Sequence, residues 1–348
     1  MRNEFTKKKR FLNACKRLPV DMTPVWIMRQ AGRFLKEYRD IRRKYAFIEM
    51  CKEPEIAAAV TLLPVTKLNV DAAIIFADIL LPLEGMGVGF GFTTHDGPVI
   101  HNPIRTANQV SKLIIPQPEE SLNYVLSAIK LVKKELGSDT PLIGFSGAPF
   151  TMASYLIEGG HSQDYLLTKK MMMDASNTWH AIMNKLSKIV LLYLGSQIKA
   201  GADAVQLFDS WAGCLSPYDY ERYVMPYNKR ILDGLKKYDV PIINFSTNNA
   251  GLLELMSKSG GDVIGVDWRI GIDKAWKRIG YKKAIQGNLD PAVLFASPEE
   301  IKRHVKDILK MTGKRNGHIF NLGHGVLPTT PESNVKVLIE FVHELSEI

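Results

Sequence analysis

Short apolar runs recur along the chain, and each ends abruptly in a polar or glycine-containing tail. Eight such runs span residues 25–28, 72–76, 142–145, 204–208, 242–245, 263–266, 284–287 and 318–322. Continuous apolar runs of this length are typical of strands buried on both faces, as in a parallel sheet. The pattern therefore predicts eight parallel strands.

Helical stretches separate these runs. They are expected over residues 54–67, 119–136, 163–200 (as two helices) and 217–238, and after Ser297 and Thr330. Ser216 and Ser297 are predicted N-caps, with Glu300 completing a capping box, whereas Pro64 should kink or end its helix. Eight strands alternating with helices predict an α/β protein, a distorted (β/α)8 TIM barrel formed as a single domain over residues 1–348.

A doubly wound dinucleotide-binding sheet is the alternative α/β architecture. It requires a GxGxxG motif after an early strand. The glycine-rich residues 85–91 instead alternate glycine with larger residues and lead to Gly97-Pro98-Val99-Ile100. We therefore expect an extra hairpin near residues 86–101 with an Asp96-Gly97 turn, and no organic cofactor.

The net charge indicates which class of partner the chain would bind. The chain has 348 residues, 46% of them hydrophobic, and a net charge of +9, which suits a polyanionic partner. Only Lys7-Lys8-Lys9-Arg10 forms a tight basic run, so residues 1–10 are expected to form a basic, flexible N-terminal arm. No nucleic-acid recognition motif follows it, which favours a small polyacid over nucleic acid.

Cysteine and histidine spacing gives no metal site. Cys15, Cys51 and Cys214 are far apart, and neither CxxC nor HExxH occurs. We therefore expect no metal, no disulfide framework and a reducing compartment. No uninterrupted apolar run reaches the roughly 18 residues of a membrane span, and a cytoplasmic protein is expected.

Two arginines follow the first predicted strand. Arg29 and Arg33 flank Gln30-Ala31-Gly32. In a barrel the carboxyl ends of the strands meet at one mouth, and guanidinium groups bind carboxylates bidentately. The position predicts an anion clamp, with ion pairs to Glu37 and Asp40 as the open alternative.

Other strand ends carry polar groups that would converge on the same mouth. Asp78 lies between apolar segments and would be desolvated unless it is paired, although a helix N-cap is the alternative. His324 lies between two glycines that allow close backbone approach to a ligand, or it is a surface-loop histidine. Ser210 lacks a nucleophile motif and is expected to donate a hydrogen bond.

Several segments carry a family resemblance. They are PVWIMRQAGRF, DAAIIFADIL, GAPFTMASYLIEGG, FDSWAG, VDW, QGNLDP and NLGHGVLP, and they span nearly the whole chain in order. Together they resemble the uroporphyrinogen decarboxylase family. The resemblance implies a cofactor-free TIM-barrel homodimer of haem biosynthesis. Its members remove the four acetate carboxyl groups of uroporphyrinogen III, giving coproporphyrinogen III and carbon dioxide.

The resemblance also implies roles for residues. Substrate carboxylates would meet Arg29, Gln30 and Arg33, with main-chain help from Ala31 and Gly32, and further contacts would come from Tyr155, Ser210, His324 and Arg42. Asp78 would accept hydrogen bonds from the pyrrole N–H groups. Asp78 and Arg33 would be the catalytic pair, with Arg33 orienting the reacting acetate while water or substrate delivers the proton.

The sequence departs from the family pattern in two places, and it leaves two alternative functions open. Lys36 stands where the family commonly has proline, and residues 247–249 lack a lysine that the family often carries there. One rival is a related barrel methyltransferase acting on corrinoid or thiol methyl groups, but such proteins typically carry zinc-binding His and Cys, and Cys214 has no neighbouring partner. The other is a non-catalytic binder of porphyrinogen or nucleic acid.

Overall fold

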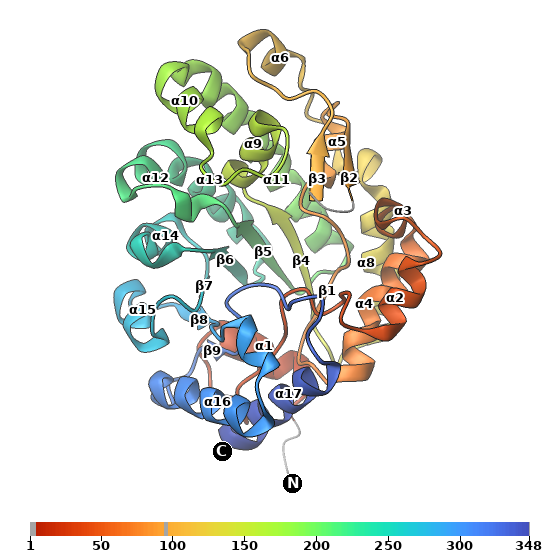
Figure 1. Cartoon of the computed structure of the whole chain (residues 1–348), viewed down its shortest axis with the longest axis vertical. Coiled ribbons are helices and arrows are strands. Elements are labelled where there is room, and N and C mark those ends of the chain that lie inside the picture. Colours follow the sequence, from red (N-terminus) through yellow and green to blue (C-terminus); the bar gives the residue numbers. More distant parts are fainter. Residues whose placement is uncertain (1–4, 94–96, 348) are drawn as a thin grey trace.

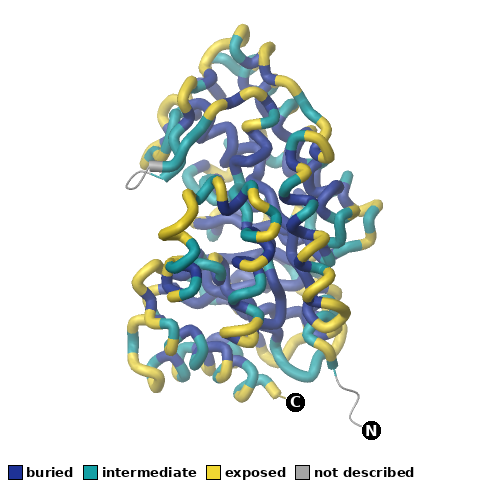
Figure 2. The backbone as a smooth tube through the Cα atoms, turned by 90° about the vertical axis from the view of Figure 1, so that its right-hand side faces the viewer, coloured by how far each residue is buried: buried dark blue, intermediate teal, exposed yellow. Residues whose placement is uncertain are grey.

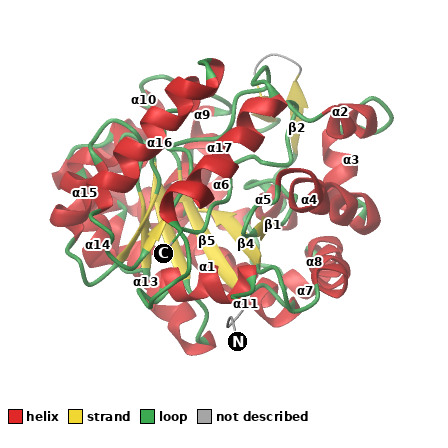
Figure 3. Cartoon of the chain, turned by 90° about the horizontal axis from the view of Figure 1, so that it is seen from below, coloured by secondary structure: helices red, strands yellow, loops and turns green. Residues whose placement is uncertain are grey.

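A curled parallel sheet organises the chain. The computed structural model describes residues 5–93 and 97–347. Within these ranges, seven strands pair in the order β1-β4-β5-β6-β7-β8-β9, all parallel to their neighbours. They are β1 (Ala73–Ile74), β4 (Leu142–Gly147), β5 (Ala204–Asp209), β6 (Ile242–Ser246), β7 (Val263–Gly265), β8 (Ala284–Gln286) and β9 (His318–Ile319). Helices surround these strands (Figures 1 and 3).

The first predicted strand is reduced to a single bridge. Val25 pairs in parallel with Phe320, and the backbone N–H of Asp71 donates to the carbonyl of Val25 (2.8 Å). This segment therefore joins β9 to the start of β1 and closes the barrel. The prediction of a full strand over residues 25–28 is wrong because side chains take the ladder positions. The N–H groups of Val25 and Met28 donate to the side chains of Asp71 (2.8 Å) and Asn321 (2.9 Å).

Helices follow nearly every strand. The first half contains α1 (Lys7–Cys15), α2 (Lys36–Arg42), α3 (Phe47–Lys52), α4 (Pro54–Leu68), α5 (Leu81–Gly85), α6 (Ala107–Lys112), α7 (Pro118–Ser121), α8 (Asn123–Leu136) and α9 (Pro149–Glu158). The second half contains α10 (Leu166–Asp174), α11 (Ser176–Ala200), α12 (Pro217–Tyr223), α13 (Met225–Leu235), α14 (Leu253–Ser259), α15 (Ile272–Ile279), α16 (Pro298–Thr312) and α17 (Glu332–Ser346). Short 3-10 turns are η1 (Ala212–Cys214), η2 (Lys236–Tyr238), η3 (Asn249–Gly251) and η4 (Pro291–Phe295). Buried segments of the chain lie toward the interior and exposed segments toward the outside (Figure 2).

Several helix predictions are confirmed. The stretch 163–200 forms the expected pair, α10 and α11. Ser216 and Ser297 cap their helices by accepting the N–H groups three residues ahead, at 3.1 and 3.4 Å. Glu300 departs from the capping-box prediction, because its carboxylate pairs with Arg303 instead.

Other helix boundaries were wrong. Pro64 lies inside α4, which continues to Leu68 because it packs against α8 along its length. The stretch 119–136 divides at Leu122 into α7 and α8. The stretch 217–238 divides at Val224, just before Pro226, because proline lacks the N–H that would continue the first helix. The last helix starts at Glu332 with no side-chain cap from Thr330.

The hairpin prediction near residues 86–101 is confirmed. The strands β2 (Phe90–Thr93) and β3 (Gly97–Ile100) pair antiparallel, with Phe90 opposite Ile100. The predicted Asp96-Gly97 turn includes Asp96, which lies outside the described residues.

The predicted flexible basic arm is wrong for residues 7–10. These residues begin α1, and their charges are bonded at the amino ends of the strands. Lys8 pairs with Asp203 (2.7 Å), and Arg10 pairs with Asp71 (2.6 Å). Residues 1–4 lie outside the described ranges. In the part of the chain that is described, no helix is long and apolar enough to cross a membrane, and the three cysteines are free.

Candidate active site

A tight turn after Val25-Trp26 presents the first arginine. The N–H of Gln30 donates to the carbonyl of Ile27 (2.8 Å), and Arg29 has a left-handed φ of +63°. Gln30 is fully buried, and its side chain accepts the N–H of Ile27 (3.0 Å) and donates to the carbonyl of Ala72 (3.1 Å). The amide of Gln30 therefore fixes the turn, and the exposed side chain of Arg29 projects from it.

Two glycines make room for this turn. A Cβ at Gly32 would lie 2.6 Å from the carbonyl oxygen of Arg29, and a Cβ at Gly325 would overlap Cδ of the same arginine. The loop that contains Gly325 is tied to the turn, because the N–H of Val326 donates to the carbonyl of Met28 (2.9 Å). The two segments that carry the strongest family signal, RQAGR and NLGHG, thus pack directly against each other.

The two arginines of the clamp are not paired with the acidic residues nearest to them in sequence. Glu37 pairs with Lys67 (2.5 Å), and Asp40 pairs with Arg43 and Lys36. Across the described residues, neither Arg29 nor Arg33 has a carboxylate oxygen within 4.0 Å. The alternative of ion pairs with Glu37 and Asp40 is therefore wrong, and both exposed guanidiniums are available to an external anion.

Arg33 and Arg42 are close enough to Tyr38 to affect its ionisation. Burial raises the pKa of Tyr38, and the positive charges of Arg42 and Arg33 oppose that shift. The ring of Tyr38 packs edge-on against Phe76, two residues before Asp78 (5.9 Å between centroids). Arg42 is exposed and donates to the carbonyl of Tyr45 (2.9 Å).

Asp78 combines a turn cap with an unused oxygen. Its Oδ1 accepts the N–H of Leu80 (2.8 Å) just before α5, so the capping interpretation holds for one oxygen. Within the described ranges no donor reaches Oδ2. Burial raises the pKa of this carboxyl to about 6, against the opposing effects of the Leu80 N–H and Arg29. Asp78 is therefore mostly ionised at pH 7 and ready to accept further hydrogen bonds.

Tyr155, near Asp78, and His324, near Arg29, are both neutral donors. Burial, together with Asp78, raises the pKa of Tyr155 to about 12. Burial and the charges of Arg29 and Arg269 lower the pKa of His324 to about 4. His324 Nδ1 accepts the N–H of Gly325 (2.6 Å), so the ring proton is on Nε2, which is left to donate to a ligand.

An apolar floor lies at the carboxyl ends of three strands. Phe145, Phe208 and Phe245 come from β4, β5 and β6, and they meet edge to face at 5.5 and 5.6 Å. Ser210 follows the middle strand and is partly buried; its carbonyl accepts the hydroxyl of Thr247 (2.5 Å). Such a floor suits the hydrocarbon face of a ring system whose polar groups lie at its edge and centre.

Arg269 is a candidate site residue that the sequence patterns did not indicate. Asp267, fully buried after β7, accepts the N–H of Asn248 (2.6 Å) and the side chain of Arg269 (2.6 Å). The guanidinium lies over the ring of Trp268 (4.2 Å) and is partly exposed. The only available signal was its place two residues after the acidic end of a predicted strand.

A second buried carboxylate differs from Asp78. Asp209 is 1% exposed, and its two oxygens accept hydrogen bonds from Thr151 and Asn228, both at 2.9 Å. Burial raises its pKa to about 6 as well. Both oxygens have partners, so Asp209 holds the end of β5 in place.

Comparison with known proteins identifies the family. The model for the family described as "Uroporphyrinogen decarboxylase (URO-D)" matches residues 6–345. The chain belongs to the uroporphyrinogen decarboxylase family. It is 56% identical to the uroporphyrinogen decarboxylase of Carboxydothermus hydrogenoformans over 97% of each chain, and 54% identical to that of Sorangium cellulosum over 97% of this chain and 96% of the relative.

A solved structure shares the fold. A methyltransferase from Methanosarcina mazei superposes with a TM-score of 0.83 over 98% of this chain and 99% of its own, at 23% identity. An identity this low speaks for the barrel alone. Among the described residues, no group of three or more His, Cys, Asp or Glu side chains is placed to hold a metal ion.

The departures from the uroporphyrinogen decarboxylase family pattern are accommodated locally. Lys36 is exposed and lies 3.8 Å from Asp40, outside the turn that carries Arg29. The loop at residues 247–249 is anchored through Thr247 to the carbonyl of Ser210 and through Asn248 to Asp267. This loop therefore supports both Ser210 and the Asp267–Arg269 pair.

Proposed function

We propose that this protein decarboxylates uroporphyrinogen III, removing its four acetate carboxyl groups without a cofactor to give coproporphyrinogen III and carbon dioxide. The proposal rests on one observation: among the described residues, one oxygen of Asp78 has no donor, and Arg29 and Arg33 of the surrounding rim have no carboxylate partner. An octacarboxylate with N–H groups at its centre matches both features. The family membership supports the same reaction.

The rim would bind the carboxylates of the substrate. Arg29 and Arg33 form the clamp, with the main chain of Ala31 and Gly32 beside them, and Arg42 and Arg269 extend the positive rim. Guanidinium groups suit this task because they offer paired donors to a planar carboxylate.

Neutral groups would complete the binding. Tyr155, Ser210 and the Nε2–H of His324 donate hydrogen bonds without adding charge. The ring itself would lie on the phenylalanine floor. In this proposal the side chain of Gln30 acts through the Arg29 turn, because its amide is already bonded within the protein.

The electron flow determines what Asp78 must do. A proton added to a pyrrole carbon makes the ring cationic. The bond between the acetate methylene and its carboxyl carbon then breaks, its electron pair neutralises the ring, and carbon dioxide leaves. A proton then adds to the exposed methylene to give the methyl group, and the proton first added leaves the ring carbon, which restores the neutral pyrrole with one proton consumed overall. A fixed carboxylate near the ring nitrogens stabilises the cation most strongly where water is excluded, as over an apolar floor.

Arg33 would orient the reacting acetate, with water or a substrate carboxyl as the acid. Arginine is a poor general acid because its pKa stays above about 12. An Arg33→Lys variant that binds normally should keep a charge near the acetate while losing the fork geometry. If Arg33 only orients the acetate, this variant should have a reduced kcat with an unchanged solvent isotope effect. A changed isotope effect would contradict this role and would mean that Arg33 takes part directly in the proton-transfer step.

The direct test is an anaerobic assay with uroporphyrinogen III, followed by oxidation and separation of products by carboxyl number. The proposal expects species with seven, six, five and finally four carboxylates. Binding without turnover would contradict it and would favour a non-catalytic binder. Methyl transfer from a thiol or corrinoid donor, again without decarboxylation, would favour the methyltransferase alternative.

We further propose that residues 1–348 act as one barrel domain in a cytoplasmic homodimer. Exposed apolar side chains on α10 support self-association: Leu166 is 69% exposed and Met173 59%. Free, mostly buried cysteines are typical of a reducing compartment. Sedimentation of wild type and of a Leu166→Lys, Met173→Lys variant tests this interface. The proposal predicts that wild type is a dimer and that the variant is a monomer.

A further inference from the structure

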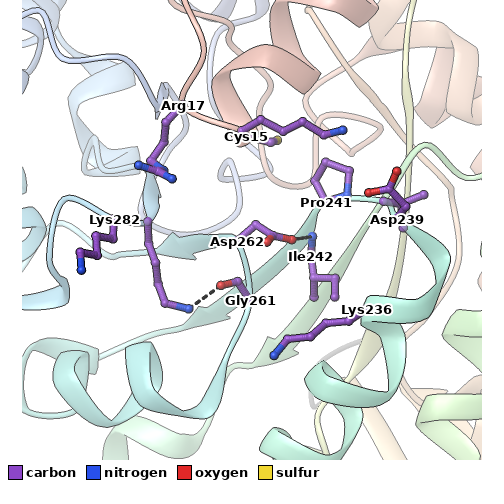
Figure 4. Close-up of a pocket in the computed structure, with 12 residues that line it drawn as sticks. Cys15, Arg17, Lys236, Asp239, Pro241, Ile242, Gly261, Asp262 and Lys282 are labelled. Carbon is purple, nitrogen blue, oxygen red and sulfur yellow. Dashed lines mark hydrogen bonds between the residues drawn. The ribbon is translucent and has the colours of Figure 1, made fainter.

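A second polar pocket lies at the opposite end of the barrel from the mouth. It has a volume of about 510 Å³ (Figure 4). It forms where the end of α1 meets the residues that lead into β6, β7 and β8. Its lining consists of Cys15, Lys16, Arg17, Lys236, Asp239, Val240, Pro241, Ile242, Gly261, Asp262, Lys282 and Lys283.

Positive charge dominates this basal pocket. Its lining has five cations, Lys16, Arg17, Lys236, Lys282 and Lys283, against two carboxylates, Asp239 and Asp262, an excess of three.

The cations are largely unpaired. Among the described residues only Lys236 of the five has a carboxylate within 4.0 Å, and that partner is Asp233, outside the pocket. The amino end of the same α1 helix is different, because its Lys8 and Arg10 are both ion-paired. The cations at the amino end of α1 are thus ion-paired, whereas those just after its carboxyl end are not paired with any described carboxylate.

Two of these pocket cations, Lys283 and Arg17, are held in position. Lys283 donates to the carbonyl of Gly261 (2.5 Å), and burial lowers the pKa of its ammonium. Arg17 has a left-handed φ of +58°, and its stem lies so close to Gly317 that a Cβ there would be 2.6 Å from Cγ of the arginine. In Figure 4, Arg17 and Lys282 lie on the same side of the pocket, across from Asp239.

The carboxylates do not neutralise the pocket. Asp262 is engaged in the fold, since its Oδ2 accepts the N–H of Ile242 (2.9 Å). Asp239 has a left-handed φ of +52° at the end of η2 and has no cation within 4.0 Å in the described part of the chain. An anion that entered the pocket would therefore meet ammonium and guanidinium donors without displacing an existing ion pair.

We propose that this basal pocket binds a small multivalent oxyanion of the pyrophosphate or phosphate-ester class through Arg17, Lys282 and Lys283. Three excess positive charges match a tri- or tetravalent anion better than a monocarboxylate. Arginine donates paired hydrogen bonds in a fixed planar geometry, and lysine supplies a compact positive charge. Both groups bind phosphate well. The pocket falls within the size range of small-molecule sites, roughly 300–1,000 Å³. A bound anion would tie α1 to the starts of β6, β7 and β8.

The test is calorimetric titration with pyrophosphate at constant ionic strength. Four proteins are compared: wild type, Arg17→Gln with Lys282→Gln, Lys130→Gln with Lys134→Gln on exposed positions of α8, and Arg29→Gln with Arg33→Gln at the mouth. Each double variant removes two positive charges. The proposal expects one saturable site in wild type, at least about tenfold weaker binding in the basal variant, and unchanged affinity in the α8 and mouth variants.

The contrary results are equally specific. No saturable site in wild type would overturn the proposal, as would equal weakening in the α8 variant, which would mean a general charge effect. Loss of binding only in the mouth variant would place the anion at the active site instead. Pyrophosphate should also raise the Tm of wild type but not of the basal variant, by linkage. Lys282→Gln alone, at an exposed position, provides the same comparison if the double variant does not fold.

Discussion

The barrel uses Arg10, at its amino end, and the Arg29–Arg33 pair, at its carboxyl end, in opposite ways. At the amino end, Arg10 is buried between Asp21 and Asp71, at 2.8 and 2.6 Å. Asp71 is itself fully buried and accepts the N–H of Val25 as well as His343. At the carboxyl end, the exposed Arg29 and Arg33 have no carboxylate within 4.0 Å among the described residues. The first arrangement holds the barrel closed, and the second leaves charge available to a ligand.

The largest expected effect concerns the closed end. Asp71→Asn leaves Arg10 buried with half of its partners, which should lower the free energy of unfolding by about 3–5 kcal/mol. Denaturant titration measures this. Asp40→Asn, which breaks an exposed pair with Arg43, should lower it by less than about 1 kcal/mol. Equal losses in the two variants would contradict the structural role of Asp71.

At the open end, Arg29→Gln should change activity and leave stability nearly intact. Losing a charged hydrogen bond costs about 1.5–3 kcal/mol, or roughly 10- to 150-fold in kcat/KM. Gly325→Ala should give a similar loss because its methyl group would displace Arg29. Lys36→Gln, nearby in sequence but outside the clamp, serves as the control. If it lost as much activity as Arg29→Gln, the effect would be one of general charge.

The pH dependence of activity should distinguish Asp78 from Asp209. Asp78 has a raised pKa of about 6, so its negative charge is lost as the pH falls through that value. Below pH 6, kcat/KM should fall up to about tenfold per unit. Substrate N–H groups stabilise the carboxylate, so the acid limb of kcat should lie at lower pH than that of kcat/KM. Identical limbs would point instead to Asp209, whose pKa is also raised to about 6 but whose two oxygens are both bonded within the protein.

The smallest effect is expected at Arg269. Its guanidinium is partly exposed and already bonded to Asp267, so Arg269→Gln should weaken substrate binding by only about 0.5–1 kcal/mol, roughly two- to fivefold. The change should appear in KM with kcat unchanged. A matching fall in kcat would mean that Arg269 acts in the transition state.

The sequence predicted the barrel because apolar runs and polar strand ends are local signals. It gave the hairpin and the N-caps at Ser216 and Ser297 for the same reason. It missed the reduction of the first strand to a bridge, since the side chains of Asp71 and Asn321 that replace the ladder come from distant segments. The passage of α4 through Pro64 likewise depends on packing between elements. The break at Val224, by contrast, has a local cause in Pro226, which the sequence prediction overlooked.

Within the candidate site, residue types were predictable but partners were not. Nothing in the sequence separates Asp78 from Asp209, since both follow a buried strand. Only the structure shows that Thr151 and Asn228 donate to both oxygens of Asp209, whereas in the described part of the chain one oxygen of Asp78 has no donor. In the same way, the basic run at residues 7–10 looked mobile until its acidic partners were brought to it by the fold.

The most direct test compares Asp78→Asn with Asp209→Asn in the anaerobic uroporphyrinogen III assay, with Tm measured on the same samples. We predict that the kcat of Asp78→Asn is at least about 100-fold lower than that of wild type, while its Tm is nearly the same. Asp209→Asn should lose about 1–3 kcal/mol of stability while keeping most of its turnover. Equal turnover in Asp78→Asn and wild type would contradict the central claim that a free carboxylate oxygen at the mouth carries the chemistry.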